Sequence, residues 1–584
     1  MRSNPADSHS RQPEDRRDQK EASIIADGAV RQDKIRLYSR PFAKGQATVA
    51  SMLSMTPDTT ESALFVTQQD RLLTIRGVRA VESAAQAAQP VPTLMQRAGQ
   101  AAAQWVRELT GDRPDPVLIL VGPGNNGGDA LVCARELMAL GYSCICVGQP
   151  ANDKTPADAR AAHTAFLAAG GVLHADIPDG TTEFASHGAP QTRGYRFSLI
   201  VDGLFGIGLN QPITAPYAKW VEAANTLSLL DDIPLLALDI ASGLHGDTGV
   251  AQALCITATH TLTYIADKPG LLTGDGPDHS GQVEICDLDI PAALFAAADA
   301  ADCGTINDPE LWADDLPQRQ LNANKGDAGS AGLLGGAPSM TGALVLAARS
   351  ALHAGAGRVY AAALGGSQAG APTLDPLQPE IMFRDPASLR DAPLTALGVG
   401  PGLGRSAVSR AVLASALDFE GPLVLDADAL VLLPTLSEQL RERTAPTLLT
   451  PHPGEAAMLL DTDIPSIEAD RIKAARNIAD QYNATVVLKG CGSIIATPDG
   501  RWWINTTGNP GMASAGMGDV LTGLTTALLA QGMAPEQALC AAVWLHGAAA
   551  DVCVESENLP KLGPLGLTAS EVILAIRSLL NSLI

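Results

Sequence analysis

Two glycine-rich stretches, each followed by a single acidic residue, are the parts of this chain best suited to chemistry. Residues 509–523 read NPGMASAGMGDVLTG and place Asp519 directly after Gly516 and Gly518, at the start of an apolar run that predicts a helix. Glycines at a helix N-terminus let backbone N–H groups approach an anion, and the helix dipole adds roughly half a positive charge. A carboxylate placed there can take a proton from a hydroxyl that attacks a terminal phosphate. The pattern therefore predicts a kinase-like phosphoryl-transfer site.

The second stretch, GPGNNGGDALV at residues 122–132, has a different character. Its glycines lack the GxGxxG spacing of the dinucleotide-binding fingerprint, and a lone glycine-rich turn after a strand is weak evidence. Asn125 and Asn126 add amide oxygens and N–H donors, while the glycines allow close backbone approach. Asp129 stands near the start of a predicted helix, where capping is the structural alternative to ligand binding.

Two further oxygen-bearing residues follow strand-like runs in the same half of the chain. Asp202 lies in VDGLFGIGLNQP and Ser242 in LDIASG. Because parallel strands end at one edge of a sheet, we expect Asn126, Asp202 and Ser242 to meet there. Oxygen donors without thiols or imidazoles favour an alkali or alkaline-earth cation. Asp239 in the same segment suits either acid–base work or ribose binding, and Lys268 is an alternative for the acid–base work.

Alternating strand-like and helix-like segments must position these residues. PVLILVG at 116–122 predicts a buried strand, DALVCARELMALG a helix after it, and SCICVG a second strand. This βαβ alternation predicts a doubly wound parallel sheet with chemistry at the carboxyl ends of its strands. The alternation of strand-like and helix-like segments weakens in an acidic segment after residue 290 and then begins again. We predict a disordered extension at 1–60, a Rossmann-like doubly wound domain at 61–290, a linker at 291–320 and a second α/β domain at 321–584.

The composition narrows the classes of partner and location. The formal net charge of −23 argues against nucleic acid and anionic membranes as general partners, so an anionic ligand must be held by local dipoles. Nine cysteines without a CxxC pair predict neither a disulfide framework nor a zinc site, which fits a reducing cytoplasm. The N-terminus lacks the apolar segment of a secretory signal, and no run of about 18 apolar residues predicts a membrane span.

The glycine run and four motifs before it resemble one enzyme family. In chain order these motifs are LGVGPGLG at 397–404, LDADAL at 425–430, LTPHPGEAAML at 449–459 and VLKGCGSIIATPDG at 487–500. Residues 321–584 together resemble the ADP- or ATP-dependent NAD(P)H-hydrate dehydratases of the ribokinase-like superfamily. The resemblance implies a ribokinase-like α/β fold. It also implies a substrate whose nicotinamide ring carries a C6 hydroxyl, which is phosphorylated and then lost as phosphate.

The same resemblance implies roles for individual residues. Asp519 is the implied base that activates the hydroxyl, with ADP as co-substrate together with Mg²⁺. Asp426 and Asp428 suit either a metal-related role or the capping of the next helix. Helix packing is the structural alternative for Ala343, and a plain loop position is the alternative for His452. The implied hydrate-binding residues are Ala343, Gly404, His452 and Asp519, and the implied nucleotide-binding residues are Lys489, Gly490, Cys491, Gly492, Ser493 and Gly518.

Residues 67–290 resemble the NAD(P)H-hydrate epimerase domain, which carries the motifs PGNNGGDG, VDALFGTG and DIPSG. Two positions depart from that pattern: Ala130 replaces the last glycine of the first motif, and Ala241 replaces the proline before Ser242. Alanine suits a helix at the first position, whereas the second change loosens a turn. The resemblance implies K⁺ binding by Asn126, Asp202 and Ser242, and hydrate binding by Asn125, Asn126, Gly127, Gly128, Asp129, Gly206, Ile207, Gly208, Leu209, Asn210, Gln211, Pro212 and Asp239.

Together the two resemblances imply a bifunctional repair enzyme for the hydrates NADHX and NADPHX. The N-terminal domain would interconvert the R and S forms, and the C-terminal domain would dehydrate the S form with release of AMP and phosphate from ADP. The residues alone do not choose between ADP and ATP, and the fused architecture favours ADP. The alternative is a vitamin- or thiazole-type small-molecule kinase with a non-catalytic N-terminal binding module. The Ala-rich helices are suited either to packing between the subunits of a homo-oligomer or to covering a sheet within a monomer.

Overall fold

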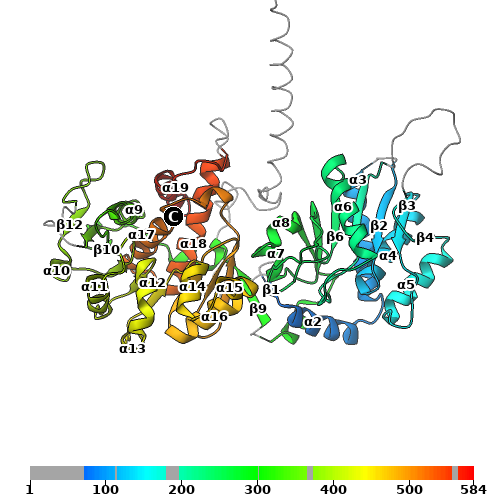
Figure 1. Cartoon of the computed structure of the whole chain (residues 1–584), viewed down its shortest axis with the longest axis horizontal. Helices are drawn as coiled ribbons and strands as arrows, with labels where there is room; N and C mark the ends of the chain where they lie inside the picture. The colour runs from blue at the N-terminus through cyan, green and yellow to red at the C-terminus, as the bar shows by residue number, and fades with distance from the viewer. Residues whose placement is uncertain (1–70, 112–114, 179–195, 300–301, 365–371, 556–562) are drawn as a thin grey trace, which may run out of the picture. The chain divides into compact units, whose positions relative to one another are not determined.

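Two β-sheets organise the part of the chain that the structure describes. A computed structural model covers residues 71–111, 115–178, 196–299, 302–364, 372–555 and 563–584 (Figure 1). These residues all belong to one unit, Met55–Ile584. The disordered extension predicted at 1–60 lies outside the described residues.

The N-terminal sheet is parallel throughout, as the βαβ alternation predicted. Successive strands run outward from β2 in one direction and from β5 in the other, so the strand order reverses between β2 and β5. In spatial order the strands are β4 (Leu173–His174), β3 (Cys144–Gly148), β2 (Val117–Val121), β5 (Leu199–Gly203), β6 (Leu235–Leu238), β7 (His260–Tyr264) and β8 (Gln282–Cys286). Such a reversal point is where ligands bind in open α/β sheets.

Helices cover both faces of this sheet, which explains its continuous apolar strands. In β2, Val117 and Ile119 pack in one core with α3, α4 and α5, whereas Leu118 and Leu120 pack in another core with α6. Burial on both faces removes the alternation of a half-exposed strand. The helices of this half are α2 (Ile75–Ala88), α3 (Leu94–Thr110), α4 (Asn125–Ala139), α5 (Ala157–Ala168), α6 (Tyr217–Asp231), α7 (Pro269–Leu272) and α8 (Gly276–Ser280).

The C-terminal sheet has a parallel centre and an antiparallel edge. Its order reverses between β10 and β13, and β16, β17 and β18 pair antiparallel. From β18 outward the strands are β18 (Trp502–Asn505), β17 (Ser493–Ala496), β16 (Thr485–Leu488), β15 (Thr447–Leu449), β14 (Leu423–Leu425), β13 (Ala396–Val399), β10 (Ser330–Gly335), β11 (Arg358–Ala363) and β12 (Met382–Arg384).

Helices also enclose this second sheet on both faces. One face packs against α9 (Thr341–His353), α17 (Met517–Ala530), α18 (Pro535–Glu555) and α19 (Ala569–Ser582). The other face packs against α11 (Ala407–Leu417), α12 (Asp428–Leu432), α13 (Ser437–Arg441), α14 (Pro453–Leu459) and α16 (Arg471–Tyr482), while α10 (Pro386–Leu389) and α15 (Ile464–Ala469) are short. The predicted α/β class, with a doubly wound N-terminal part and a second α/β part, is confirmed.

Two strands from outside the predicted C-terminal domain extend its sheet. β1 (Arg71–Leu73) pairs antiparallel with β9 (Cys303–Ile306), and β9 pairs parallel with β18. β9 lies in the segment predicted as a linker, which also contains short 3₁₀ turns. Its strand signal is weak because the strand is short and only Gly304 in it is fully buried. The domain limits stay predictions.

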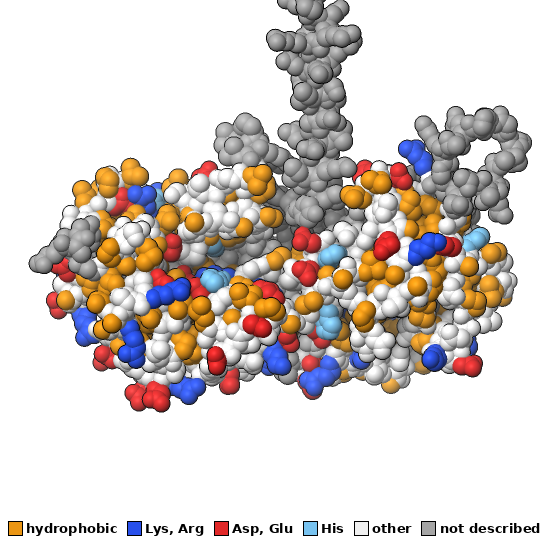
Figure 2. All heavy atoms as spheres, viewed as in Figure 1, with side chains coloured by type: hydrophobic (Ala, Val, Ile, Leu, Met, Phe, Trp, Pro, Cys, Tyr) orange, Lys and Arg blue, Asp and Glu red, His pale blue; other side chains and the backbone are white. Residues whose placement is uncertain are grey.

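Three general properties of the chain concern its cysteines, its apolar helices and its surface charge. All nine cysteines are free. Among the described residues, α18 is the one helix long and apolar enough to cross a membrane, and most of it is buried in the protein core. On the face shown in Figure 2, acidic side chains are interspersed with Lys and Arg.

Candidate active sites

The first candidate site lies at the reversal point of the N-terminal sheet. The loop after β2 enters α4 at Asn125, and its N-cap residue is Gly124. Asp202 is within β5, and Ser242 follows β6. The structure thus brings Asp202 and Ser242 into contact, and Asn126 lies beside the loop that follows β5, because a Cβ on Gly206 would lie 3.6 Å from its side chain.

Asp202 and Ser242 form a tight buried pair. The Ser242 hydroxyl donates to Asp202 Oδ1 at 2.7 Å, and the Ser242 N–H donates to Oδ2 at 2.8 Å. Both residues are fully buried, and burial raises the pKa of Asp202 to about 6. The change from proline to Ala241 therefore leaves Ser242 firmly held, because its neighbour Ala241 is itself buried and the pair fixes the turn.

The buried side chain of Asn126 is the part of this site best suited to binding a ligand. It is 7% exposed, and neither its Oδ1 nor its Nδ2 has a hydrogen-bond partner among the described residues. An unpaired buried amide costs about 1–3 kcal/mol. A cation coordinated by the amide oxygen and by the Asp202 carboxylate would remove part of that cost and offset the buried negative charge. The donor set therefore fits a hard cation such as K⁺.

Asp239 is ion-paired with a buried lysine beside this site. Its Oδ1 lies 2.9 Å from the Lys268 Nζ, and the Lys268 side chain is 0% exposed. The Ile207 N–H donates weakly to Asp239 Oδ2 at 3.4 Å. Asp239 has a φ of +66°, a strained conformation for a residue with a Cβ and one that clusters at functional sites. The two alternatives for acid–base work, Asp239 and Lys268, are thus in direct contact.

The loop 206–212 contacts the site at its first two residues, Gly206 and Ile207. A Cβ on Gly206 would lie 2.9 Å from Asp239 Oδ2 and 3.6 Å from the Asn126 side chain. At the far end, the Gln211 carbonyl accepts a hydrogen bond from Gln252 at 3.1 Å. The structure therefore joins Gly206 and Ile207 to the site more closely than Gln211 and Pro212.

Asp129 does not cap its helix. The helix begins four residues earlier, so Asp129 lies in its second turn and the capping alternative is wrong. Burial raises the pKa of Asp129 well above its usual range, and the charges of Asp239 and Glu82 raise it further. Burial also raises the pKa of Glu82 on α2, and the charge of Asp239 raises it further. Glu82 was not predicted as a site residue, and its place beside the apolar stripe of α2 was the available signal.

The second candidate site is built around the N-terminus of α17. Gly516 is the N-cap residue, with a φ of +93° in the left-handed region that glycine adopts freely, and Asp519 lies in the first turn. Burial raises the pKa of Asp519 to about 7, with Asp426 adding to the shift and Lys489 opposing it. A carboxyl group with this pKa is well matched to taking a proton near neutral pH.

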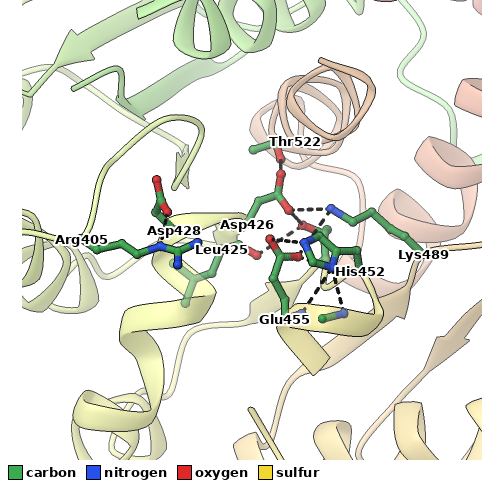
Figure 3. A network of polar contacts seen from close by, with 10 residues as sticks. Arg405, Leu425, Asp426, Asp428, His452, Glu455, Lys489 and Thr522 are labelled. Carbon is green, nitrogen blue, oxygen red and sulfur yellow. Dashed lines mark hydrogen bonds and ion pairs between the residues drawn. The ribbon is translucent and has the colours of Figure 1, made fainter. Parts of the chain in front are cut away.

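Lys489 connects this helix end to a network of polar side chains (Figure 3). Its Nζ lies 2.9 Å from Asp426 Oδ1, and a Cβ on Gly518 would lie 3.3 Å from that Nζ. Asp426 also accepts hydrogen bonds from the hydroxyls of Thr450 at 2.7 Å and Thr522 at 2.8 Å. Burial acts to lower the pKa of Lys489, but Asp426 and Glu455 outweigh it and raise that pKa. The site thus holds a charged ammonium beside the glycine run.

A cavity of about 400 Å³ opens next to this network, at the reversal point of the C-terminal sheet. Ala343 from α9 lines it, so this residue is not hidden by helix packing alone. Asp428 lines it as well and shapes the neighbouring turn, because its carboxylate accepts from the Gly404 N–H and from Arg405 Nε, each at 2.8 Å. The capping alternative for Asp428 is wrong, since the N-cap of α12 is Ala427 and makes no side-chain bond.

His452 has a structural task at this site. Its Nδ1 accepts the Gly454 N–H at 2.9 Å and caps α14, while Glu455 accepts the His452 N–H at 2.8 Å. The imidazole Nε2 lies 3.4 Å from Glu455 Oε1, and the side chain is 57% exposed. Substrate contact by His452 remains a prediction, and it would have to use the exposed ring edge.

Comparison with known proteins identifies the family of the chain. The family model described as NAD(P)H-hydrate dehydratase matches residues 331–569, and the model described as YjeF-related protein N-terminus matches residues 92–270. The bifunctional NAD(P)H-hydrate repair enzyme Nnr of Escherichia coli (strain K12) is 35% identical over 494 residues, which are 84% of this chain and 89% of that protein. The chain belongs to the family of bifunctional NAD(P)H-hydrate repair enzymes.

A relative from a distant organism agrees with this assignment. The bifunctional NAD(P)H-hydrate repair enzyme of Leishmania braziliensis is 35% identical over 542 residues, covering 86% of this chain and 92% of that protein. An ADP/ATP-dependent NAD(P)H-hydrate dehydratase from Bacillus subtilis, co-crystallised with ATP and Mg²⁺, is 29% identical; the match covers 48% of this chain and 98% of that chain, with a TM-score of 0.42. The prediction of a bifunctional repair enzyme is confirmed, and the small-molecule kinase alternative is not favoured.

Proposed function

We propose that the N-terminal site interconverts the R and S hydrates of NADH and NADPH, and that the C-terminal site dehydrates the S form with ADP. The observation that carries this proposal is Asp519, a half-buried carboxyl with a pKa near neutrality at the mouth of a glycine-rich helix N-terminus and beside Lys489. That combination supports removal of a hydroxyl proton while an adjacent phosphate is held by N–H groups and an ammonium.

In the dehydration, Asp519 takes the proton of the C6 hydroxyl as its oxygen attacks the β-phosphorus of ADP. The bond between that phosphorus and the bridging oxygen breaks, and AMP leaves. The C6–O bond of the resulting phosphate ester then breaks, a ring proton is lost, and NADH or NADPH is formed with inorganic phosphate. The N–H groups at Gly518 and the Lys489 ammonium are placed to stabilise the charge on the transferred group.

The cavity beside this network supports the placement of the hydrate. Ala343, Gly402 and Arg405 line it, and Asp428 holds Gly404 at its rim. Residues from Lys489 to Ser493 hold the nucleotide in this proposal, and the Ser493 hydroxyl keeps their turn closed by donating to the Gly490 carbonyl at 3.0 Å.

The proposed function includes two bound cations, Mg²⁺ in the C-terminal site and K⁺ in the N-terminal site. Asp426 and Glu455 would hold Mg²⁺ together with phosphate oxygens, and the ion would supply charge neutralisation there. Among the described residues, no group of three or more His, Cys, Asp or Glu side chains that could hold a metal ion is found. Asn126, Asp202 and Ser242 would hold K⁺, which would orient the hydrate in the N-terminal site.

In the N-terminal site, Asp239 takes the proton of the C6 hydroxyl and passes it to the ring nitrogen N1 as the C6–N1 bond breaks, which leaves an open-chain aldehyde. The reverse transfer closes the ring on either face of the aldehyde and so interconverts the epimers, while the Lys268 ammonium holds the Asp239 carboxylate in place. The pair is suited to this because its contact is direct and only Asp239 has exposed surface, 14% of its side chain. Asn125 to Asp129 and residues 206–212 seat the rest of the hydrate in this proposal.

The decisive experiment supplies both hydrate epimers with ADP, ATP or no nucleotide and follows recovery of reduced-nicotinamide absorbance. Complete recovery with ADP is expected. A plateau at the S fraction, apart from slow spontaneous epimerisation, would remove the epimerase assignment, and absence of nucleotide-dependent recovery would remove the dehydratase assignment. Faster recovery with ATP than with ADP would reverse the choice of nucleotide. A cytoplasmic location and a homo-oligomeric state remain predictions.

A further inference from the structure

A threonine of the N-terminal half contacts the loop that is proposed to bind nucleotide in the C-terminal half. Thr273 directly follows α7, and its Oγ1 lies 3.1 Å from the Cys491 carbonyl oxygen and 3.0 Å from the Gly492 carbonyl oxygen. The next residue adds a backbone bond, because the Gly274 N–H donates to the same Cys491 carbonyl at 3.3 Å. Thr273 is fully buried.

Gly492 of the loop packs directly against the backbone of Leu272, the residue before Thr273. Gly492 has a φ of +59°, and a Cβ at this position would lie 2.0 Å from the Leu272 carbonyl oxygen. No side chain larger than hydrogen fits at that distance. The glycine therefore serves the contact with α7 as well as the turn of the loop itself.

A buried arginine links the threonine to the start of the same loop. The Arg471 side chain is 2% exposed, its Nε donates to Thr273 Oγ1 at 3.1 Å, and its Nη2 donates to the Lys489 carbonyl at 3.2 Å. Its remaining nitrogen pairs with Glu468 at 3.1 Å. Fixed on three sides, the guanidinium ties the two ends of the loop, at Lys489 and at Gly492, to one hydroxyl group.

We propose that Thr273 and Arg471 are positioning residues through which the epimerase half sets the nucleotide affinity of the dehydratase. The proposal rests on the nucleotide-binding role proposed for residues 489–493. Thr273 is also joined through the short helix α7 to Lys268, the partner of Asp239 in the other site. The N-terminal site and the loop at residues 489–493 are thereby connected by one continuous run of buried residues, from Lys268 to Thr273.

The contact fixes a backbone conformation and touches neither the C6 hydroxyl nor Asp519. Its loss should therefore weaken ADP binding and leave the chemical step nearly unchanged. This split between KM and kcat separates a positioning role from general damage to the fold, which would reduce the amount of active enzyme and lower kcat.

The test compares three variants of the full chain. Thr273→Val removes the hydroxyl and keeps the shape, and Thr273→Ser restores the hydroxyl. Thr261→Val is the matched control, because the Thr261 hydroxyl is equally buried in the same half and donates to the Ser280 carbonyl at 2.7 Å, away from the loop. The KM for ADP and kcat are measured with saturating hydrate, and ADP binding is measured directly by calorimetry.

The expected result is a rise of about fivefold in the KM and Kd for ADP in Thr273→Val, the factor that corresponds to one ordinary hydrogen bond, with kcat within about twofold of the unmodified chain. Thr273→Ser and Thr261→Val should stay within about twofold in all constants. An unchanged KM in Thr273→Val, or an equal rise in Thr261→Val, would overturn the positioning role while leaving the dehydratase assignment intact. An unmodified chain without ADP-dependent dehydration would overturn both.

Discussion

The pH dependence of dehydration should follow the ionisation of Asp519. Burial and the neighbouring charge of Asp426 raise the pKa of this carboxyl to about 7. A base acts only when it is deprotonated, so activity is lost as the pH falls through that value. With a single titration centred near 7, about a tenth of the carboxyl is ionised at pH 6 and about nine tenths at pH 8. The value of kcat/KM for the hydrate should thus rise about tenfold between these pH values.

The assay measures kcat/KM for the S hydrate with saturating ADP at constant ionic strength and constant K⁺. Subtraction of a blank without enzyme removes spontaneous changes of the hydrate. Asp519→Asn should lower kcat/KM by roughly a hundredfold to ten-thousandfold, the usual contribution of a general base, and should leave ADP binding largely intact. Asp461→Asn is the matched control, because Asp461 is exposed with a φ of +51° that asparagine also adopts readily.

Two results would refute this reasoning. One is a flat profile between pH 6 and 8 in the unmodified chain, since it would show that no group with the pKa of Asp519 governs the step. The other is an Asp519→Asn variant that keeps the pH dependence of the unmodified chain, since the titrating group would then lie elsewhere.

Three further predictions test the parts around these sites. Asp202→Asn should make epimerisation insensitive to exchange of K⁺ for a large organic cation, whereas the unmodified chain should lose about tenfold in rate; equal sensitivity of both would exclude Asp202 as a ligand. Asp239→Ala leaves the buried Lys268 unpaired and should lower the free energy of unfolding by about 3 kcal/mol in urea, with recovery in the double variant that adds Lys268→Met; no recovery would exclude the unpaired charge as the cause. A Cβ on Gly402 would lie 2.4 Å from the Met340 carbonyl oxygen, so Gly402→Ala should raise the KM for the hydrate but not for ADP, and a rise in both would argue against a hydrate cavity there.

Several features of this protein were predictable from local sequence alone. The buried parallel strands, a helix after β2 and the helix that begins beside Asp519 all follow from apolar periodicity and glycine placement, and the structure confirms them. The helix after β2 begins at Asn125, four residues before the predicted start at Asp129. The contact between Asp202 and Ser242 also followed, because the ends of parallel strands share one edge.

Other features depend on residues that are far apart in the chain. Asp426 and Lys489 are separated by 63 positions, and Thr273 and Arg471 by 198. The coupling of Glu82 to Asp239, the raised pKa of Asp519 and the capping role of His452 were not visible in any motif. The strand β9 also escaped notice, since its pairing with β1 and β18 and not its own composition makes it a strand.

The difference between the features that local sequence predicts and those that it does not has a physical reason. Helix starts, turns and buried strands are set by the backbone preferences and apolar spacing of neighbouring residues, which a sequence displays directly. Ionisation and ion pairing are set by distance and solvent access, which exist only after the chain has folded. The sequence by itself therefore determined the buried parallel strands, the glycine-rich turns and the carboxyl groups beside them. Only the tertiary structure decided which of those carboxyl groups has a pKa raised by burial and which threonine contacts the loop at Cys491 and Gly492.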